Sequence, residues 1–197
     1  MQSRSKETQK RIIDASLDLF SKLGYDGTGV ADICNEANVS KGAFYHHFNS
    51  KQAVFLALLN NWLNELDLSM QEARDSARSV PEDLINMAGI IKKVFEAAGG
   101  RFSMFLEFWI QSNRKPEIWE TTVSPYRRYQ DMFSSIIKKG IEEKSLEKEV
   151  NPDSVAKVII ALALGLLLQA FFDPKGAVWD ELTRDGMRML LNGIVRR

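Results

Sequence analysis

Cysteine, proline and histidine are scarce in this chain: its 197 residues include one cysteine, five prolines and two histidines. The single thiol, Cys34, excludes an internal disulfide framework, and such sparing use of cysteine is typical of a reducing compartment. The first residues, "MQSRSKETQKR", also lack the apolar core of a secretion signal. We therefore expect a cytoplasmic protein.

An excess of charge of either sign is missing as well. The 26 lysines and arginines balance 26 aspartates and glutamates, so the formal net charge is zero. This balance excludes a generally polycationic surface that would coat nucleic acid, but it does not exclude a small basic patch. Hydrophobic residues make up 45% and charged residues 26%, which is ordinary for a soluble globular protein and argues against disorder.

No hydrophobic run is long enough to predict a membrane span. The longest unbroken one, residues 158–168, has 11 residues and is followed by Gln169. A spanning helix needs about 20 apolar residues. We expect this segment to form a helix that is buried in the fold or in a dimer.

Apolar residues recur at steps of three and four through nearly the whole chain, and no alternating run of useful length predicts a strand. The first such stripe ends at Gly24, a residue suited to a helix C-terminus. A second stripe over residues 30–37 follows Thr28, which we expect to be its N-cap. After a break at residues 38–40, a third short helix covers residues 41–47. The first stripe consists of Ile12, Ala15, Leu19, Phe20 and Leu23.

A fourth helix is predicted to open at Asn49, since Gln52 stands three residues on as in a capping box, and to run toward Arg78. Pro125 lies inside a later helical stretch, where a proline can kink or split it. The fold class is therefore all-α, with a small N-terminal unit over residues 1–50 and a larger helical body over residues 51–197. The helices of the body are predicted at roughly residues 82–98, 101–113, 116–144, 152–172 and 177–195.

The stretch "NVSKGAFYHHF", residues 38–48, combines small, aromatic and basic side chains. On a helix, Phe44 and Phe48 lie one turn apart and define an inward face. At about 100° per residue, the remaining side chains then form an outward surface. That surface consists of Gly42, Ala43, Tyr45 and His46, with Lys41 and His47 at its margins.

This outward surface suits entry into the major groove of double-stranded DNA. Its small residues let the helix N-terminus approach base edges, and its polar side chains can donate to phosphates or bases. Thr28 and Lys51, at the starts of the neighbouring helices, are placed to hold phosphates on either side. Together these segments predict a helix-turn-helix whose second helix reads DNA. The DNA-contacting residues that we expect are Thr28, Ser40, Lys41, Gly42, Ala43, Tyr45, His46, His47 and Lys51.

Other interpretations of this stretch are weaker. Adjacent His46 and His47 diverge by about 100° on a helix, whereas paired metal ligands normally stand three or four residues apart, so we expect no metal site. For Tyr45 a core position competes with the DNA-contacting one. Cys34 lies on a buried stripe beside Ile33, which favours an inert core thiol over a nucleophile.

The run "GYDGTGVADICNEANVSKGAFYHHFNSKQAV", residues 24–54, resembles the DNA-binding signature of the TetR family of bacterial transcriptional regulators. "LEFW", residues 106–109, is similar to a motif in many regulatory domains of that family. The resemblance implies a homodimer whose two reading helices enter successive major grooves of a pseudo-palindrome, usually to repress. It also implies an effector cavity in the larger domain. The matching features are Gly24-Tyr25, Thr28, Val30, Asp32-Ile33, Ala37, Val39-Ser40-Lys41-Gly42, Tyr45, Phe48 and Lys51.

The chain departs from this family pattern at three positions. Asn38 replaces the glycine common in the turn, and asparagine tolerates the left-handed backbone conformation better than most residues. Gly29 stands where a hydroxyl residue often helps to hold phosphate, and Ala31 stands where an arginine is common. Basic residues near the N-terminus are expected to supply further phosphate contacts. These are Arg4, Lys6, Lys10 and Arg11.

The body carries two further sets of candidate residues. Aromatic side chains with a few isolated polar groups suit a small-molecule cavity, although the same stripes also suit plain core. From these we expect a small apolar or aromatic effector, held by Phe102, Phe105, Trp109, Asn113, Tyr126, Gln130 and Phe133. The helix over residues 159–172 is apolar nearly all round, and the last helix has an apolar stripe of its own, which favours an isologous dimer contact over burial within one subunit. The expected contact residues are Ile159, Leu162, Leu166, Met187, Leu190, Leu191 and Ile194.

These observations predict a ligand-responsive regulator that binds DNA and is released from it by the effector. A DNA-binding or architectural protein without an effector is the main alternative. A small helical enzyme is a third class, but the sequence lacks metal-ligand spacing, a phosphate-binding glycine loop and paired carboxylates of catalytic type. We expect no cofactor and no catalytic residue.

Overall fold

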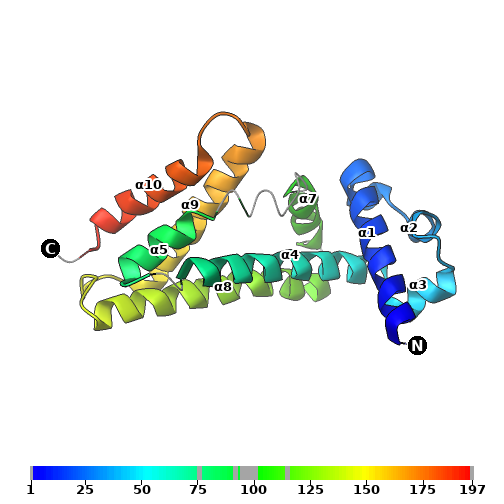
Figure 1. Cartoon of the computed structure of the whole chain (residues 1–197), viewed down its shortest axis with the longest axis horizontal. Coiled ribbons are helices and arrows are strands. Elements are labelled where there is room, and N and C mark those ends of the chain that lie inside the picture. Colours follow the sequence, from blue (N-terminus) through cyan, green and yellow to red (C-terminus); the bar gives the residue numbers. More distant parts are fainter. Residues whose placement is uncertain (1, 75–76, 91–92, 94–101, 114–115, 196–197) are drawn as a thin grey trace. The chain divides into compact units, whose positions relative to one another are not determined.

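The computed structural model describes residues 2–74, 77–90, 93, 102–113 and 116–195, and in these ranges its regular structure is helical. One isolated antiparallel bridge joins Leu146 to Val195. The all-α prediction is therefore confirmed. The helices of Figure 1 are α1 (Gln2–Gly27), α2 (Val30–Glu36), α3 (Lys41–His47), α4 (Lys51–Arg74), α5 (Val80–Ala88), α7 (Phe102–Ser112), α8 (Pro116–Glu142), α9 (Pro152–Phe172) and α10 (Trp179–Asn192).

The chain divides into two compact units. Unit 1 comprises Met1–Asn64 with Arg101–Thr122, and unit 2 comprises Glu65–Gly100 with Val123–Arg197. Two long helices, α4 and α8, therefore contribute to both units. This division differs from the boundary at residue 50, because the start of α4 and all of α7 pack with the N-terminal helices.

Most helix ends coincide with the predicted signals. Gly24 has φ 77° and interrupts α1 where the first stripe was expected to end. Ser40 caps α3 by accepting a hydrogen bond from the Ala43 amide at 3.1 Å. The start of α4 differs by one residue from the prediction, since Ser50 rather than Asn49 accepts from the amide of Ala53 at 3.1 Å.

Some predictions on the helices need correction. Leu23, assigned to the buried stripe of the first helix, is 56% exposed, because it lies on the last turn before the break at Gly24. Pro125 does not split the long helix, since α8 continues through it from Pro116 to Glu142. The helix expected over residues 82–98 is observed as α5, which ends at Ala88, and most of the remainder lies outside the described residues.

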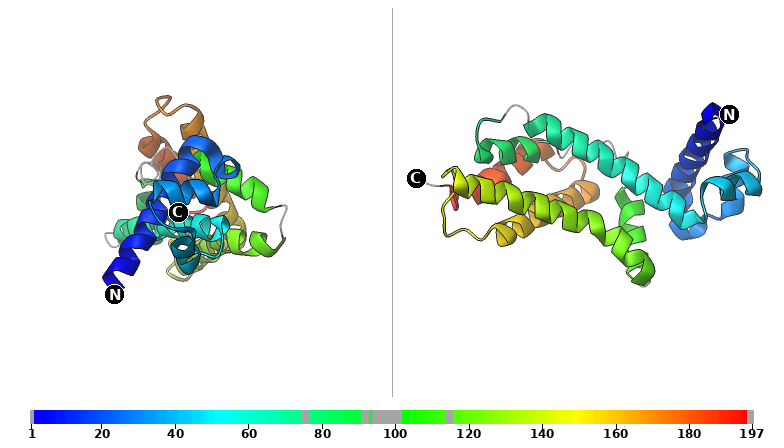
Figure 2. Two further views of the ribbon diagram at one scale, coloured as in Figure 1. Left: turned by 90° about the vertical axis from the view of Figure 1, so that its right-hand side faces the viewer. Right: turned by 90° about the horizontal axis from the view of Figure 1, so that it is seen from below.

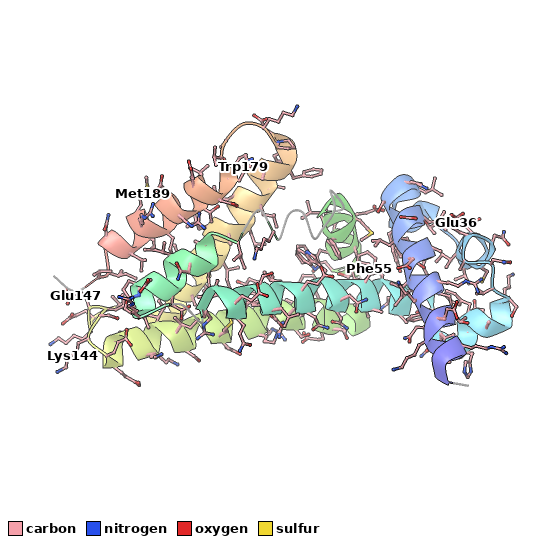
Figure 3. All side chains as sticks on the ribbon, viewed as in Figure 1. Glu36, Phe55, Lys144, Glu147, Trp179 and Met189 are labelled. Carbon is pink, nitrogen blue, oxygen red and sulfur yellow. The ribbon has the colours of Figure 1, made fainter. Side chains whose placement is uncertain are left out.

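Unit 1 has an aromatic core. Phe20, Phe44 and Phe55 are almost completely buried in it. Phe55 of α4 stacks on Phe108 of α7 at a centroid distance of 3.9 Å, and Trp62 stacks on Phe105 at 4.7 Å. Helices α2 and α3 both contact α1 (Figures 1 and 2), and the side chain of Phe55 is labelled in Figure 3. Helix α3 also contacts α2, so it is held against both preceding helices.

Unit 2 has a separate aliphatic core. Leu84, Ile137 and Leu146 are at most 1% exposed, and they come from α5, α8 and the segment after α8. Helix α10 packs against both α5 and α9. Asn151 caps α9 by accepting from the Ser154 amide at 2.9 Å, and Pro152 follows at the first helical position. Ile159 of α9 and Met187 and Leu191 of α10 belong to this core.

Candidate DNA-binding surface and effector pocket

Helix α3 presents one face to the core and the opposite face to solvent. Phe44 is 0% exposed and Phe48 5%, whereas Tyr45 is 54% exposed. The Tyr45 ring meets the Phe44 ring edge-on at 5.3 Å, so the buried residue supports the exposed one. The predicted inward face is confirmed, and the core alternative for Tyr45 is wrong. Lys41, Gly42 and His46 are exposed, while Ala43 and His47 are half-buried.

Arg11 of α1 holds the turn between α2 and α3. Asn38 has φ 50°, the left-handed conformation expected of it. The Arg11 guanidinium donates to the carbonyl of Ala37 and, at 2.6 Å, to that of Asn38. Arg11 was expected to bind phosphate, but here its charge neutralises the carbonyl end of α2. Its spacing of 26 residues from Ala37 gives no local signal from which this pairing could have been predicted.

Thr28 was expected to cap α2 and to contact phosphate, and the structure corrects both assignments. Gly29 is the N-cap, and its amide donates to the Asp32 carboxylate at 2.8 Å. Thr28 is 1% exposed, and its hydroxyl donates to the carbonyl of Gly24 at 2.9 Å. A side chain that is buried and already hydrogen-bonded cannot reach the DNA backbone, so Thr28 is a structural residue.

Lys51 also has partners inside the protein. Its ammonium donates to the carbonyls of Tyr25 at 2.6 Å and Thr28 at 2.8 Å, and it lies 4.3 Å from the centroid of the Tyr25 ring. These bonds tie the start of α4 to the end of α1 and to Thr28, which follows that helix. The sequence showed that Lys51 begins a helix, but only the folded chain brings these carbonyls to it.

Glu107 of α7 also contacts the end of α1, just after Gly24. Its carboxylate accepts from the amides of Tyr25 at 3.4 Å and Asp26 at 3.5 Å. A Cβ on Gly24 would lie 3.2 Å from this carboxylate, so glycine suits both the positive φ and the close approach. Glu107 stands in the "LEFW" motif, which was noted in the sequence without a role for its acid. Burial raises the pKa of Tyr25, with a smaller effect from Asp26, to about 12.

The described part of the chain contains no group of three or more histidine, cysteine or acidic side chains that could hold a metal ion. His46 and His47 stand edge to face at 5.1 Å and have no acidic ligand grouped with them. Cys34 is buried, and burial raises the pKa of its thiol.

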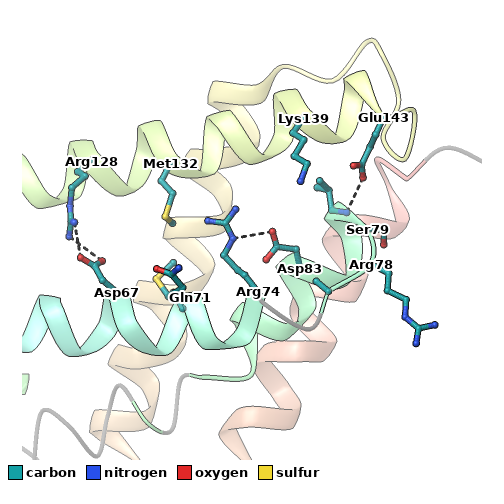
Figure 4. A pocket seen from close by; sticks show the side chains of 13 residues that line it. Asp67, Gln71, Arg74, Arg78, Ser79, Asp83, Arg128, Met132, Lys139 and Glu143 are labelled. Atoms are coloured by element: carbon teal, nitrogen blue, oxygen red, sulfur yellow. Dashed lines mark hydrogen bonds and ion pairs between the residues drawn. The ribbon is translucent and has the colours of Figure 1, made fainter.

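Unit 2 contains a pocket of about 580 Å³ between α4, α5 and α8. Figure 4 shows Arg74, Asp83 and Lys139 pointing into it from these three helices. Arg74 donates through Nε to Oδ2 of Asp83 at 3.2 Å. Asp83 is 8% exposed, and burial raises the pKa of its carboxyl, an effect that Arg74 partly offsets. The walls are mainly polar and charged, with Met70, Met132 and Val80 as the larger apolar side chains.

The residues predicted for an effector cavity do not line this pocket. Phe105 is 3% exposed and belongs to the aromatic core of unit 1, and Phe133 packs against the core of unit 2. Asn113 and Tyr126 are exposed. Asn113 was expected to be a polar group on a buried apolar face, and its exposure shows that this expectation is wrong. Trp109 and Gln130 are half-buried, and the side chain of Phe102 lies outside the described residues.

The residues predicted for a dimer contact are also largely internal. Ile159, Met187 and Leu191 belong to the core of unit 2, and Leu166 is 8% exposed. Leu162, Leu190 and Ile194 are half-buried. Other apolar residues of the C-terminal pair are exposed instead: Val158, Leu164, Phe172, Val178, Leu182 and Met189. The nearly all-round apolar pattern of α9 is observed, and the residues predicted for the contact lie mostly on the side that packs inside the subunit.

A small trihelical unit with a capped turn and an exposed reading helix defines a helix-turn-helix DNA-binding protein. Residues 12–58 match the profile of bacterial regulatory proteins of the tetR family, and residues 89–197 match that of the BetI-type transcriptional repressor C-terminal domain. The chain therefore belongs to the TetR family of transcriptional regulators.

The sequences of individual relatives align with nearly the whole chain. The transcriptional regulator UidR of Escherichia coli K12 is 20% identical over 99% of this chain and 96% of its own. IcaR of Staphylococcus aureus Newman, a negative regulator of a biofilm operon, is 24% identical over 95% of this chain and 98% of its own.

Solved structures show the same fold. A putative regulator from Pseudomonas aeruginosa PAO1 superposes with a TM-score of 0.80 at 21% identity, covering 95% of this chain and 90% of its own. A putative regulator from Saccharomonospora viridis, solved in complex with choline, gives 0.75 at 22% identity, covering 98% of this chain and 100% of its own.

Proposed function

We propose that this regulator represses transcription as a cytoplasmic homodimer on a pseudo-palindromic operator and that a small molecule in its helical body releases it. The exposed face of α3, supported by two buried phenylalanines and a capped start, is the observation that carries this proposal. UidR and IcaR are regulators of similar length, and IcaR is named as a negative one, which supports repression.

The proposed DNA contacts come from α3 and from Ser40, its N-cap. Lys41, Tyr45 and His46 are exposed and can donate to phosphates or to base acceptors. Gly42 is exposed without a side chain, which lets the helix start approach the base edges closely. Ser40, Ala43 and His47 complete the proposed surface. Lys51 has a positioning role in it, because its ammonium is bonded to Tyr25 and Thr28.

The proposed dimer contact is the open face of α9 and α10. In α9, an 18-residue window with mean hydropathy 2.3 is only 39% buried, although the helix is long and apolar enough to cross a membrane. In α10, Met189 is 73% exposed, and Figure 3 labels it on the outer side of the helix. A Cβ on Gly165 would meet nothing within 4 Å, so a partner helix could approach closely there. Covering this face with a second copy would bury it without a membrane.

The experiment that tests the proposal begins with selection of bound sequences from a random DNA pool by the full chain. We expect an enriched pseudo-palindrome with half-sites about one helical turn or more apart. Tyr45→Ala should then weaken binding to that sequence at least about tenfold, as expected for loss of a base or phosphate contact. Tyr126→Ala is the matched control, since Tyr126 is also an exposed tyrosine but lies on α8.

Two results would decide against the proposal. Unselective, salt-sensitive binding without an enriched sequence would contradict a dimeric reader. Selective binding that no small molecule weakens would support a DNA-binding protein without an effector.

A further inference from the structure

The pocket of unit 2 brings three charged side chains together from three helices. Arg74 comes from the last turn of α4, Asp83 from the first turn of α5 and Lys139 from the last turns of α8. Figure 4 shows them converging on the space between α4 and α8. Their separation along the sequence means that the pocket exists only in the folded chain.

Three other charged residues of the wall already have partners. Arg128 donates to both carboxylate oxygens of Asp67 at 2.7 and 3.2 Å. Glu143 accepts from the Val80 amide at 3.0 Å and from the Ser145 hydroxyl at 2.8 Å, and these bonds lower its pKa. The charge of Lys139 also contributes to lowering the pKa of Glu143, but no ion pair within 4.0 Å joins these two side chains in the described structure.

The ion pair between Arg74 and Asp83 is incomplete on both sides. Arg74 uses only Nε, and a guanidinium has two further nitrogens that could bind a planar oxyanion in a bidentate way. Oδ1 of Asp83 is buried without a hydrogen-bond partner in the described structure. Asp83 is the buried partner, with a side chain that is 11% exposed, and buried carboxylate oxygens normally have a hydrogen-bond partner. The Arg74 side chain is 38% exposed, so its terminal nitrogens can reach a ligand in the pocket.

Lys139 lies close enough to Asp83 to influence the ionisation of that carboxyl, yet no ion pair within 4.0 Å involves Lys139 among the described residues. Its ammonium and the terminal nitrogens of Arg74 face the same space (Figure 4). Two cationic side chains from different helices therefore point into the same pocket.

We propose that the pocket binds a small organic acid, with the acid group held between the Arg74 guanidinium and the Lys139 ammonium and the organic part lying against Met70 and Met132. This inference rests on the proposed ligand-responsive function and names the chemistry of its ligand. A volume of about 580 Å³ leaves room for more than a bare ion. Asp83 positions Arg74 and does not itself contact the acid.

The wall chemistry argues against two other ligand classes. The thirteen lining residues include no aromatic side chain, so the pocket lacks the aromatic cage by which quaternary ammonium groups are bound. The choline bound to the relative from Saccharomonospora viridis is therefore a poor guide to the ligand of this pocket. The polar wall also differs from the apolar or aromatic effector expected from the sequence.

The test is calorimetric titration of the full chain with acetate, lactate and succinate, with inorganic phosphate and choline as comparison probes and sodium chloride at equal ionic strength as baseline. We expect at least one carboxylate to bind and Lys139→Gln to weaken it about tenfold or more, since a charge-assisted hydrogen bond is lost. Lys138→Gln is the matched control, because Lys138 is an exposed neighbour on α8 that does not line the pocket. Both variants should fold, since both lysines are exposed.

Three results would overturn the inference: no carboxylate binds, choline or phosphate binds in preference, or the two lysine variants bind equally. Binding to the selected DNA, measured on the same preparations, separates this from failure of the proposed function. A protein that binds its DNA but no organic acid leaves the regulator standing and removes the ligand assignment. A protein that binds the acid but no DNA supports the ligand assignment and contradicts the proposed regulator function.

Discussion

The helix-turn-helix region, α2 with α3, and the C-terminal pair, α9 with α10, differ in how much their sequences reveal. In the first, apolar and polar residues alternate at helical spacing, so the buried side of α3 could be predicted from Phe44 and Phe48. In the second, α9 is apolar on nearly every side, and its pattern did not show which side packs inside the subunit. Exposed surfaces can therefore be predicted where a helix is amphipathic, and cannot where it is uniformly apolar.

The two regions also differ in what holds them. The helix-turn-helix region is fixed by long-range polar bonds from Arg11 and Lys51 to backbone carbonyls. The C-terminal pair is held by the aliphatic core of unit 2, with residues such as Ile159 and Leu191 at 2% and 3% exposure. The following four experiments test this contrast, beginning with the largest expected effect.

Phe44→Ala should destabilise the helix-turn-helix region most. Phe44 is 0% exposed, and removing a fully packed aromatic side chain costs about 3–5 kcal/mol. We expect a lower midpoint in urea denaturation and loss of DNA binding. Tyr45→Ala is the control from the opposite face, and its cost should stay below about 1.5 kcal/mol, the upper range for one aromatic pair. Equal costs for both variants would mean that the two faces of α3 are not distinct.

The paired change Val158→Asp with Met189→Asp should disrupt the proposed dimer. Both residues are at least half exposed in the subunit, so folding should be retained while carboxylates enter the contact from both copies. Burying unpaired charges costs several kcal/mol, which should shift the chain to monomer in sedimentation at micromolar concentration. Lys138→Asp changes an exposed residue of α8, outside this face, and should leave the oligomer intact. A paired variant that sediments as a dimer would exclude this face as the contact.

Lys51→Met should lower both stability and DNA affinity, because it removes two ammonium bonds to the carbonyls of Tyr25 and Thr28. Hydrogen bonds to charged groups contribute about 1.5–3 kcal/mol each when buried, and partial exposure reduces the expected loss to about 1–3 kcal/mol. Chemical denaturation measures it. Lys41→Met should cost less than about 0.5 kcal/mol of stability while reducing the salt dependence of DNA binding. If both variants lose only DNA affinity, Lys51 contacts phosphate as the sequence alone suggested.

The smallest effect concerns pH. Burial raises the pKa of Tyr25 from 10.0 to about 12, so the unfolded chain loses this proton at lower pH than the folded one. Its contribution to stability is therefore complete below pH 10 and declines as pH rises through 12. We expect a loss of about 1 kcal/mol after allowance for partial exposure. Comparing Tyr25→Phe with the parent in denaturation at several alkaline pH values measures it, and identical slopes would contradict a buried phenol.

Much of the fold could be predicted because helix signals are local. Gly24, Ser40 and Pro152 mark helix ends by backbone geometry or capping, which depend on a few neighbouring residues. The exposed face of α3 followed from the same periodicity. Thr28 was misassigned because a hydroxyl residue before a helix is a good cap in general, and only the fold shows that Gly24 occupies its hydroxyl.

The candidate pocket could not be predicted in this way. Arg74, Asp83 and Lys139 each look like ordinary surface charges in their own segments, and Asp83 looks like a favourable acid at a helix start. Aromatic stripes drew attention to Phe105, whose size and apolarity suit a core as well as a cavity. No local pattern separates these two roles, since both bury the same side chain.

The sequence by itself determined the helical class, most helix ends and the inward and outward sides of α3, because these depend on spacing and capping within one turn or two. Only the tertiary structure decided that Arg11 and Lys51 stabilise turns, that Glu107 contacts the amides after Gly24, and which side of α9 stays open. It also brought Arg74, Asp83 and Lys139 together around one pocket. These features depend on contacts between residues far apart in the chain, and such contacts are fixed only when the helices pack.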